Sequence, residues 1–277
     1  MWRCRARRMM GSMPEAKPIS PPALALLALE GRAVLEVGAL VAAWPVLALS
    51  PRGDGHPVLV LPGFLASDRS TTPLRAFLRG RGYAAYGWGR GTNLGPWPDV
   101  LPMLQARLHE LAARHDRKVS LVGWSLGGVF ARALARETPA AVRQVITLAC
   151  PLRAFHANSL GRFFGSGPRT QRAMPEILAR AQEPLEVPTT AIVSRSDGIV
   201  AWQSCTEVPG PLRETLEVQS SHCGMGHHPA ALRIVADRLA QAEGRWRPFR
   251  EGARGRWPFD RRLRMRRTPS GGSLSAA

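Results

Sequence analysis

Lysine is nearly absent from this chain of 277 residues, which has only Lys17 and Lys118 among its 38 lysines and arginines. Arginine therefore supplies almost all of the net charge of +18, and residues 1–20 carry +4 of it while residues 245–267 carry +8. Basic ends of this kind can bind nucleic acid or an anionic membrane surface. The chain has no aromatic-interleaved RNA-binding motif, zinc-finger spacing or helix-turn-helix signal, so no specific nucleic-acid partner is expected. We interpret residues 1–20 and 245–277 as basic tails that are disordered.

Cysteine is also scarce, and the chain contains only Cys4, Cys150, Cys205 and Cys223. None of them belongs to a C-x-x-C pair, and their wide spacing matches neither a zinc site nor a redox motif. An even count permits two disulfides, but nothing in the sequence requires them. Reduced thiols in a cytoplasmic protein are the simpler interpretation.

The chain lacks an uninterrupted hydrophobic run long enough for a membrane span. Its most apolar stretch, residues 23–49, is interrupted by Glu30, Arg32 and Glu36, which are costly at the centre of a bilayer. It also lacks the cleavage pattern of a secretory signal. We expect an N-terminal helical segment over residues 21–50, an amphipathic helix or helix pair packed on the body. Peripheral membrane contact by this segment stays open, and with it a membrane-associated location.

What the chain does have is an alternation of strand and helix patterns between residues 51 and 244. The expected strands are 56–61, 83–88, 118–122, 142–148, 189–194 and 214–218, and the expected helices are 72–81, 98–115, 126–136 and 229–241. Successive strand–helix units predict an α/β fold, a mostly parallel sheet with helices on both faces. No internal repeat is present.

Residues 151–186 break this alternation with four prolines and the loop run Gly165-Ser166-Gly167. We interpret them as a small lid inserted into the domain of residues 51–244. Leu160, Phe163 and Phe164 would give such a lid an apolar inner side, although they could equally form its own packing core.

The most informative motif is Gly123-Trp124-Ser125-Leu126-Gly127, which lies between an apolar strand pattern and a helix pattern. A G-x-S-x-G turn at such a junction is a nucleophile elbow, which holds the serine in a strained conformation with its hydroxyl exposed above the sheet. The two glycines are required because a Cβ at either position would collide with the neighbouring strand and helix. Ser125 is therefore the candidate nucleophile.

A serine hydroxyl needs a base to activate it, and the base needs an orienting acid. Asp197 follows the expected strand 189–194, which makes it the candidate acid, although an aspartate before glycine is often a simple turn former. His222 follows the strand 214–218 most closely and is the preferred base. His227 and His228 adjoin the last helix, where capping or surface roles are the alternative.

The oxyanion formed during acyl transfer needs preorganised N–H donors. The backbone N–H of Leu126, directly after the nucleophile, is one candidate. The other is Phe64 in the loop Leu61-Pro62-Gly63-Phe64, where Gly63 would let the backbone approach closely. An ordinary strand-ending Pro-Gly turn is the competing interpretation of that loop.

These motifs together resemble the α/β-hydrolase superfamily, and more closely its bacterial lipase- and esterase-like members. The resemblance covers about residues 56–241 and is carried by Leu-Pro-Gly-Phe (61–64), Gly-Trp-Ser-Leu-Gly (123–127), Ser-Arg-Ser-Asp-Gly-Ile-Val (194–200) and Ser-Ser-His-Cys-Gly-Met (220–225). It implies the α/β-hydrolase fold, a Ser125–Asp197–His222 triad, and hydrolysis of a carboxylic ester without a metal or an organic cofactor. The loop 61–63 departs from the His-Gly of many lipases, which leaves the substrate class open.

The leading hypothesis is a serine hydrolase, an esterase or lipase that acts on a small-molecule or lipid-like ester with an apolar acyl group. Two alternatives remain at this stage. An acyltransferase would use the same triad with an alcohol or thiol in place of water. A non-catalytic interaction protein would bind acidic partners through the basic tails.

Overall fold

A seven-stranded sheet in the order β2-β1-β3-β4-β5-β6-β7 forms the centre of the computed structural model, which describes residues 19–153, 157–159, 168–249 and 266–267. The strands are β1 (Pro57–Leu61), β2 (Ala84–Gly87), β3 (Val119–Trp124), β4 (Val142–Leu148), β5 (Thr189–Val193), β6 (Arg213–Glu217) and β7 (Arg266–Arg267). The first six are parallel, and β7 pairs antiparallel with β6. Strands β1, β3, β4 and β5 are buried along their whole length, as the apolar runs of a sheet covered on both faces require.

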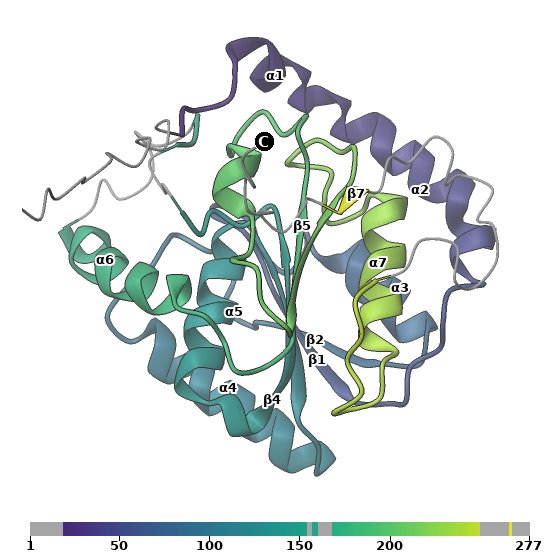
Figure 1. Cartoon of the computed structure of the whole chain (residues 1–277), viewed down its shortest axis with the longest axis vertical. Coiled ribbons are helices and arrows are strands. Elements are labelled where there is room, and N and C mark those ends of the chain that lie inside the picture. The colour runs from purple at the N-terminus through teal and green to yellow at the C-terminus, as the bar shows by residue number, and fades with distance from the viewer. Residues whose placement is uncertain (1–18, 154–156, 160–167, 250–265, 268–277) are drawn as a thin grey trace, which may run out of the picture.

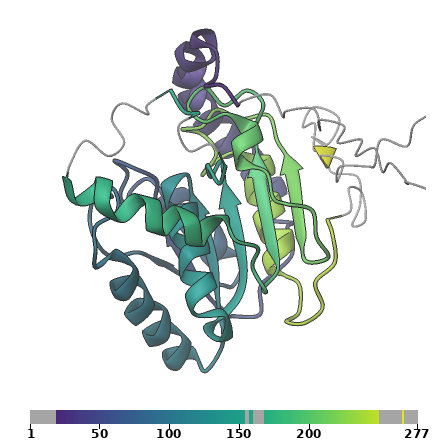
Figure 2. The ribbon, with the colours of Figure 1, turned by 60° about the vertical axis from the view of Figure 1, so that its left-hand side comes forward.

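Helices cover both faces of the sheet (Figures 1 and 2). They are α1 (Leu24–Ala28), α2 (Ala33–Leu47), α3 (Thr72–Gly80), α4 (Val100–His115), α5 (Leu126–Glu137), α6 (Pro168–Gln182) and α7 (Pro229–Leu239), with short 3₁₀ helices η1 (Leu29–Arg32), η2 (Pro139–Ala141) and η3 (Trp202–Cys205). Helices α2, α3 and α7 enclose one large hydrophobic cluster, and α4, α5 and α6 enclose a second on the opposite face. The predicted parallel α/β sheet with helices on both faces is confirmed.

The order of the strands places a topological switch point between β1 and β3. From β1 the chain crosses to β2 on one side, and it then returns to β3 on the other side. Loops that leave the carboxyl ends of such strands diverge and leave a crevice between them, which is the usual binding position in open parallel sheets. Here the two loops carry Gly63 after β1 and Ser125 after β3.

The N-terminal segment forms α1, η1 and α2 and packs on the body against α7. The expectation of an amphipathic helix was wrong for α2. Every exposed residue from 34 to 49 is apolar, proline or glycine, while the inward side carries the buried carboxylate of Glu36 together with Leu40, Ala43 and Leu47. The polar groups of this segment therefore face the protein interior. Among the residues that the structure describes, we find no helix whose length and hydropathy would allow it to span a bilayer.

The described part of the predicted lid is built into the body. Helix α6 packs on α5, and its Met174, Ile177 and Ala181 belong to the same core as the helices beside it. Residues 157–159 run next to the loop after β5, where the Ser159 N–H donates to the carbonyl of Ile199 at 2.8 Å. Leu160, Phe163 and Phe164, on which the apolar lid was predicted, lie outside the described residues.

The described residues beyond 244 also contact the body. The N–H of Phe249 donates to the Glu214 carboxylate at 2.8 Å, and the ring of Phe249 is buried. The Glu214 carboxylate also pairs with Arg238 of α7 at 2.8 Å. The body therefore extends at least to residue 249, while most of both predicted tails lies outside the described residues.

Candidate active site

Ser125 occupies a sharp turn between β3 and α5. Its φ of 51° and ψ of −122° are rarely adopted by a residue with a side chain, and such strain costs about 1–3 kcal/mol. The turn is held by the Ser125 N–H, which donates to the carbonyl of Leu148 on the neighbouring strand at 2.8 Å. The predicted strand, sharp turn and helix are all present, with the serine at the carboxyl edge of the sheet.

The two glycines of the elbow allow backbones to meet. A Cβ on Gly123 would lie 2.4 Å from the Gly127 carbonyl oxygen, and a Cβ on Gly127 would lie 2.3 Å from the Leu61 carbonyl oxygen. Real Cβ atoms do not approach backbone atoms this closely. A side chain at either position would therefore clash with neighbouring backbone, which is the reason that the sequence pattern has glycine at both.

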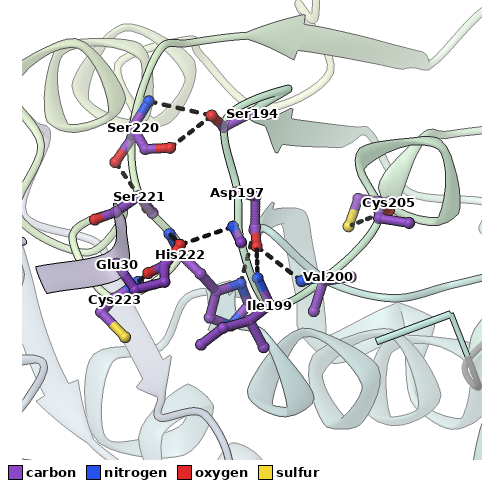
Figure 3. A network of polar contacts seen from close by, with 12 residues as sticks. Glu30, Ser194, Asp197, Ile199, Val200, Cys205, Ser220, Ser221, His222 and Cys223 are labelled. Carbon is purple, nitrogen blue, oxygen red and sulfur yellow. Dashed lines mark hydrogen bonds and ion pairs between the residues drawn. The ribbon is translucent and has the colours of Figure 1, made fainter. Parts of the chain in front are cut away.

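Asp197 lies on the loop after β5, and both of its carboxylate oxygens are used (Figure 3). Oδ1 accepts the N–H groups of Ile199 and Val200, each at 2.8 Å. Oδ2 lies 2.7 Å from Nδ1 of His222. The first oxygen therefore fixes the carboxylate on its own loop, and the second is free to orient the imidazole.

His222 lies on the loop after β6 and is buried. With Nδ1–H donated to Asp197, the lone pair is left on Nε2, which is the tautomer that a general base needs. The Trp124 indole N–H donates to the carbonyl of His222 at 3.1 Å, so the residue directly before Ser125 contacts the residue that would activate it. Burial lowers the pKa of His222, but the charge and hydrogen bond of Asp197 and the charge of Glu30 outweigh burial and raise the pKa above its ordinary value.

The two other histidines considered as the base have structural partners. His228 is the N-cap of α7, where its Nδ1 accepts the N–H of Ala230 at 3.3 Å. Nε2 of His227 lies 3.1 Å from the carbonyl oxygen of Ala33 at the start of α2. Capping, predicted as the alternative role at these positions, is thus observed for His228, although both side chains are buried rather than on the surface.

The loop after β1 reaches the nucleophile. A Cβ on Gly63 would lie 3.2 Å from Cβ of Ser125, so the backbone of this loop passes directly beside the elbow. Leu126 begins α5 and is fully buried, and Phe64 packs partly buried against the core on the α5 side. Both predicted oxyanion donors thus belong to segments adjacent to Ser125.

Asn93 is a residue that sequence reasoning missed. It is fully buried, and its side-chain amide donates to the Pro62 carbonyl at 2.9 Å. Its backbone carbonyl accepts the N–H of Leu65 at 2.7 Å, where the chain has a left-handed φ of 58°. Asn93 thereby holds the loop beside Ser125, and its position in the Gly-rich run 87–95 was the only available signal.

A second Asp–His–Ser array lies at the opposite, amino-terminal edge of the sheet. His56 has Nδ1 at 2.5 Å from Asp54 and Nε2 at 2.8 Å from the hydroxyl of Ser120. Ser120 and His56 have no exposed surface, and Ser120 lies within β3, outside any strained turn. Burial lowers the pKa of His56 to about 4. This array links His56 to the start of β3 by a hydrogen bond. The Ser120 hydroxyl lacks the access to substrate that a catalytic serine requires.

Cys223 directly follows the preferred base His222 in the sequence. Its side chain is exposed and free, as Cys150 and Cys205 are free in the interior. Partial burial and the nearby Glu30 raise the pKa of its thiol to about 12. The thiol therefore stays protonated at neutral pH and is a poor second nucleophile.

Within the part of the chain that the structure describes, no cluster of three or more His, Cys, Asp or Glu side chains could hold a metal ion.

A parallel sheet with a serine elbow after β3, an acid after β5 and a histidine after β6 defines the α/β-hydrolase fold. Solved structures similar to this chain have that fold. A lipolytic enzyme of the metagenome-derived LipS and LipT pair aligns with a TM-score of 0.51 and 20% identity over 69% of this chain and 94% of its own. The mature lipase BlEst2 of Bacillus licheniformis aligns with a TM-score of 0.51 and 15% identity over 70% of this chain and 95% of its own. No protein-family model and no curated protein matches the sequence. The resemblance predicted from the four motifs is confirmed at the level of the fold.

Proposed function

We propose that this protein is a serine hydrolase that cleaves a carboxylic ester through an acyl-enzyme on Ser125. The observation that carries the proposal is the 2.7 Å contact between Nδ1 of His222 and Asp197, made at the carboxyl edge of the sheet beside a strained serine elbow. Strain of this kind persists only where the surrounding structure enforces it, and it concentrates at functional sites.

In the first half of the reaction, Ser125 Oγ attacks the ester carbonyl carbon while His222 Nε2 takes the hydroxyl proton. Asp197 holds the imidazole and stabilises the imidazolium. The N–H groups of Leu126 and Phe64 bind the oxyanion, and the tetrahedral intermediate collapses as His222 gives its proton to the leaving alcohol. Water, deprotonated by His222, then attacks the acyl-enzyme, and the acid is released as Ser125 regains its proton.

A fluorophosphonate probe tests the nucleophile directly. We expect covalent labelling of the wild-type chain at Ser125, no labelling of Ser125→Ala, and hydrolysis of a p-nitrophenyl ester series with a preference for apolar acyl chains. Both aligned structures are of lipolytic proteins, which supports the choice of ester substrates. Wild-type protein that resists the probe and hydrolyses no ester would overturn the proposal.

Repeating the assay with added alcohols or thiols separates hydrolysis from acyl transfer, because a transferase would form the new ester or thioester at the expense of the free acid.

The proposed ester is lipid-like, and the outer face of α2 gives the protein a means of reaching it. Val34 and Leu35 are each 75% exposed and Val41 is 70% exposed, with Trp44 on the same helix. The 15 residues of α2 span about 22 Å, which is less than the ~30 Å hydrocarbon core, so this helix would lie in the membrane interface. The basic residues 1–20 directly precede the segment, and anionic lipid would attract them.

Vesicle cosedimentation tests this membrane contact. We expect the full chain to bind phosphatidylserine-containing vesicles more tightly than phosphatidylcholine vesicles, and the double variant V34E/V41E to bind about tenfold or more weakly, because it removes apolar side chains from the contact. Val208→Glu changes an exposed valine outside the segment and is the matched control. Equal binding of all three proteins would refute the contact. A dimer of the wild type that V34E/V41E dissociates, without vesicle binding, would assign the face to a second copy of the chain.

A further inference from the structure

A buried carboxylate of the N-terminal segment contacts the loops that carry Asp197 and His222. Glu30 of η1 is buried, and its Oε1 accepts the N–H of Gly198 at 2.8 Å and the N–H of His222 at 2.9 Å. Its Oε2 accepts the N–H of Cys223 at 2.9 Å. One side chain, more than 160 residues away in sequence, therefore joins the loop of the acid to the loop of the base (Figure 3).

Glu36 of α2 holds the preceding part of the base loop. Its carboxylate accepts the Ser221 N–H at 2.8 Å, the Ser221 hydroxyl at 2.7 Å and the Ser220 hydroxyl at 3.3 Å. The Arg32 guanidinium, between the two glutamates in sequence, lies 3.6 Å from Glu36 and donates to the Ser196 carbonyl. The three charged residues that interrupt the apolar run thus all face the loops of Asp197 and His222.

The loops are shaped to receive this segment. A Cβ on Gly198, next to the acid, would lie 2.2 Å from the carbonyl oxygen of Leu26 in α1. A Cβ on Gly224, two residues after the base, would lie 1.3 Å from a carboxylate oxygen of Glu36. Close approach of the backbone of α1 therefore accounts for glycine at 198, whereas a side chain at 224 would displace the Glu36 carboxylate.

We propose that Glu30 is a positioning residue of this active site, which fixes the spacing of the Asp197 and His222 loops and adds a second buried negative charge beside the imidazole. The inference rests on the proposed function, because it assigns His222 as the base. Two roles follow from it. The three N–H bonds align the imidazole with Asp197, and the charge favours the imidazolium that forms when Ser125 gives up its proton.

The charge of Glu30 can be separated from its bonds by the titration of His222. The charged and titratable groups on elements packed around this loop are Asp197 after β5, Glu30, Arg32 and Glu36 of the N-terminal segment, Cys223 on the same loop, and His227 and His228 before α7. Among the carboxylates, Asp197 and Glu30 raise the pKa of His222 against the effect of burial. Removal of the Glu30 charge should therefore lower that pKa, whereas removal of the Glu36 charge should leave it nearly in place.

The experiment compares Glu30→Gln, Glu30→Asp and Glu36→Gln in the full chain, with folding checked by thermal unfolding. We expect Glu30→Gln to lower kcat/KM for a p-nitrophenyl ester about tenfold or more, because it removes the charge beside the imidazole and replaces one acceptor oxygen by an NH2 group, which leaves at least one of the buried N–H groups without its acceptor. In the pH profile of kcat/KM, the fall in activity on the acidic side (the acid limb) should move to lower pH in Glu30→Gln, because a base with a lowered pKa stays neutral down to a lower pH. Glu36→Gln should also lose activity, but with its acid limb near that of the wild type. Glu30→Asp keeps the charge, so its acid limb should stay at the pH of the wild type even if the shorter side chain lowers the rate.

The His222 imidazole resonances, followed by NMR across the same pH range, give a readout that does not depend on any substrate. A lower pKa of His222 in Glu30→Gln than in Glu36→Gln would support the positioning role even if the ester assignment failed. Equal pKa values in both variants and the wild type would overturn it, as would equal shifts of the acid limb. The proposed function is tested separately: it fails if the wild-type protein neither reacts with the fluorophosphonate nor cleaves an ester.

Discussion

Replacement of Ser125 by alanine is expected to lower kcat/KM for ester hydrolysis by at least about 10⁴-fold, because it removes the only atom proposed to form the acyl-enzyme. Residual turnover should remain above the uncatalysed rate, since the oxyanion donors and the binding surface persist. The fold should be retained: alanine has the same Cβ as serine and meets the same backbone strain at a φ of 51°. Steady-state kinetics and thermal unfolding of purified protein measure both effects.

The second Asp–His–Ser array supplies the matched control. Ser120→Ala removes a serine hydroxyl that also lies 2.8 Å from a histidine, but at the opposite edge of the sheet. We expect this variant to keep nearly wild-type kcat/KM and to lose about 1–3 kcal/mol of stability, because Nε2 of His56 loses its buried partner. If Ser125→Ala stayed active while Ser120→Ala did not, the nucleophile would be misassigned, in spite of the elbow.

Much of this site could be predicted because its signals are local. A buried parallel strand is a short apolar run and an elbow is a five-residue pattern, so the strand 142–148 was predicted at its observed bounds and Ser125 at its observed turn. Asp197 and His222 could be placed because the carboxyl ends of parallel strands meet at one edge of the sheet. Each of these inferences needs only the residues next to it and the order of the strands.

Glu30 and Asn93 could not be assigned in that way, because their partners lie far away in sequence. Glu30 was interpreted only as a charge that argues against a membrane span, whereas it accepts N–H groups from residues 198, 222 and 223. The expected amphipathic helix was wrong for a related reason. The sequence pattern assigns charged residues to the solvent side by default, but in this segment Glu30 and Glu36 accept buried backbone N–H groups and Arg32 donates to a backbone carbonyl. The exposed residues from 34 to 49 are instead all apolar, proline or glycine. Only the tertiary structure reveals such an inversion.

Replacement of His222 by alanine should lower kcat/KM by at least about 10⁴-fold, comparable to the loss in Ser125→Ala, because the two residues act as one unit. The double variant should therefore be little worse than either single one. His228→Ala is the matched control from the same loop. It removes the N-cap acceptor of α7, which should reduce stability by about 0.5–2 kcal/mol and leave most of the activity.

The opposite pattern, a collapse of activity in His228→Ala with His222→Ala active, would assign the base to the start of α7. It would also leave the contact between Asp197 and His222 without a catalytic purpose. Two features of the structure argue against that outcome. The imidazole of His228 uses Nδ1 to accept the Ala230 N–H, and burial lowers its pKa. His222 instead has Nδ1 fixed by a carboxylate and its pKa raised, so it gains the proton from Ser125 more readily and holds the resulting charge beside Asp197.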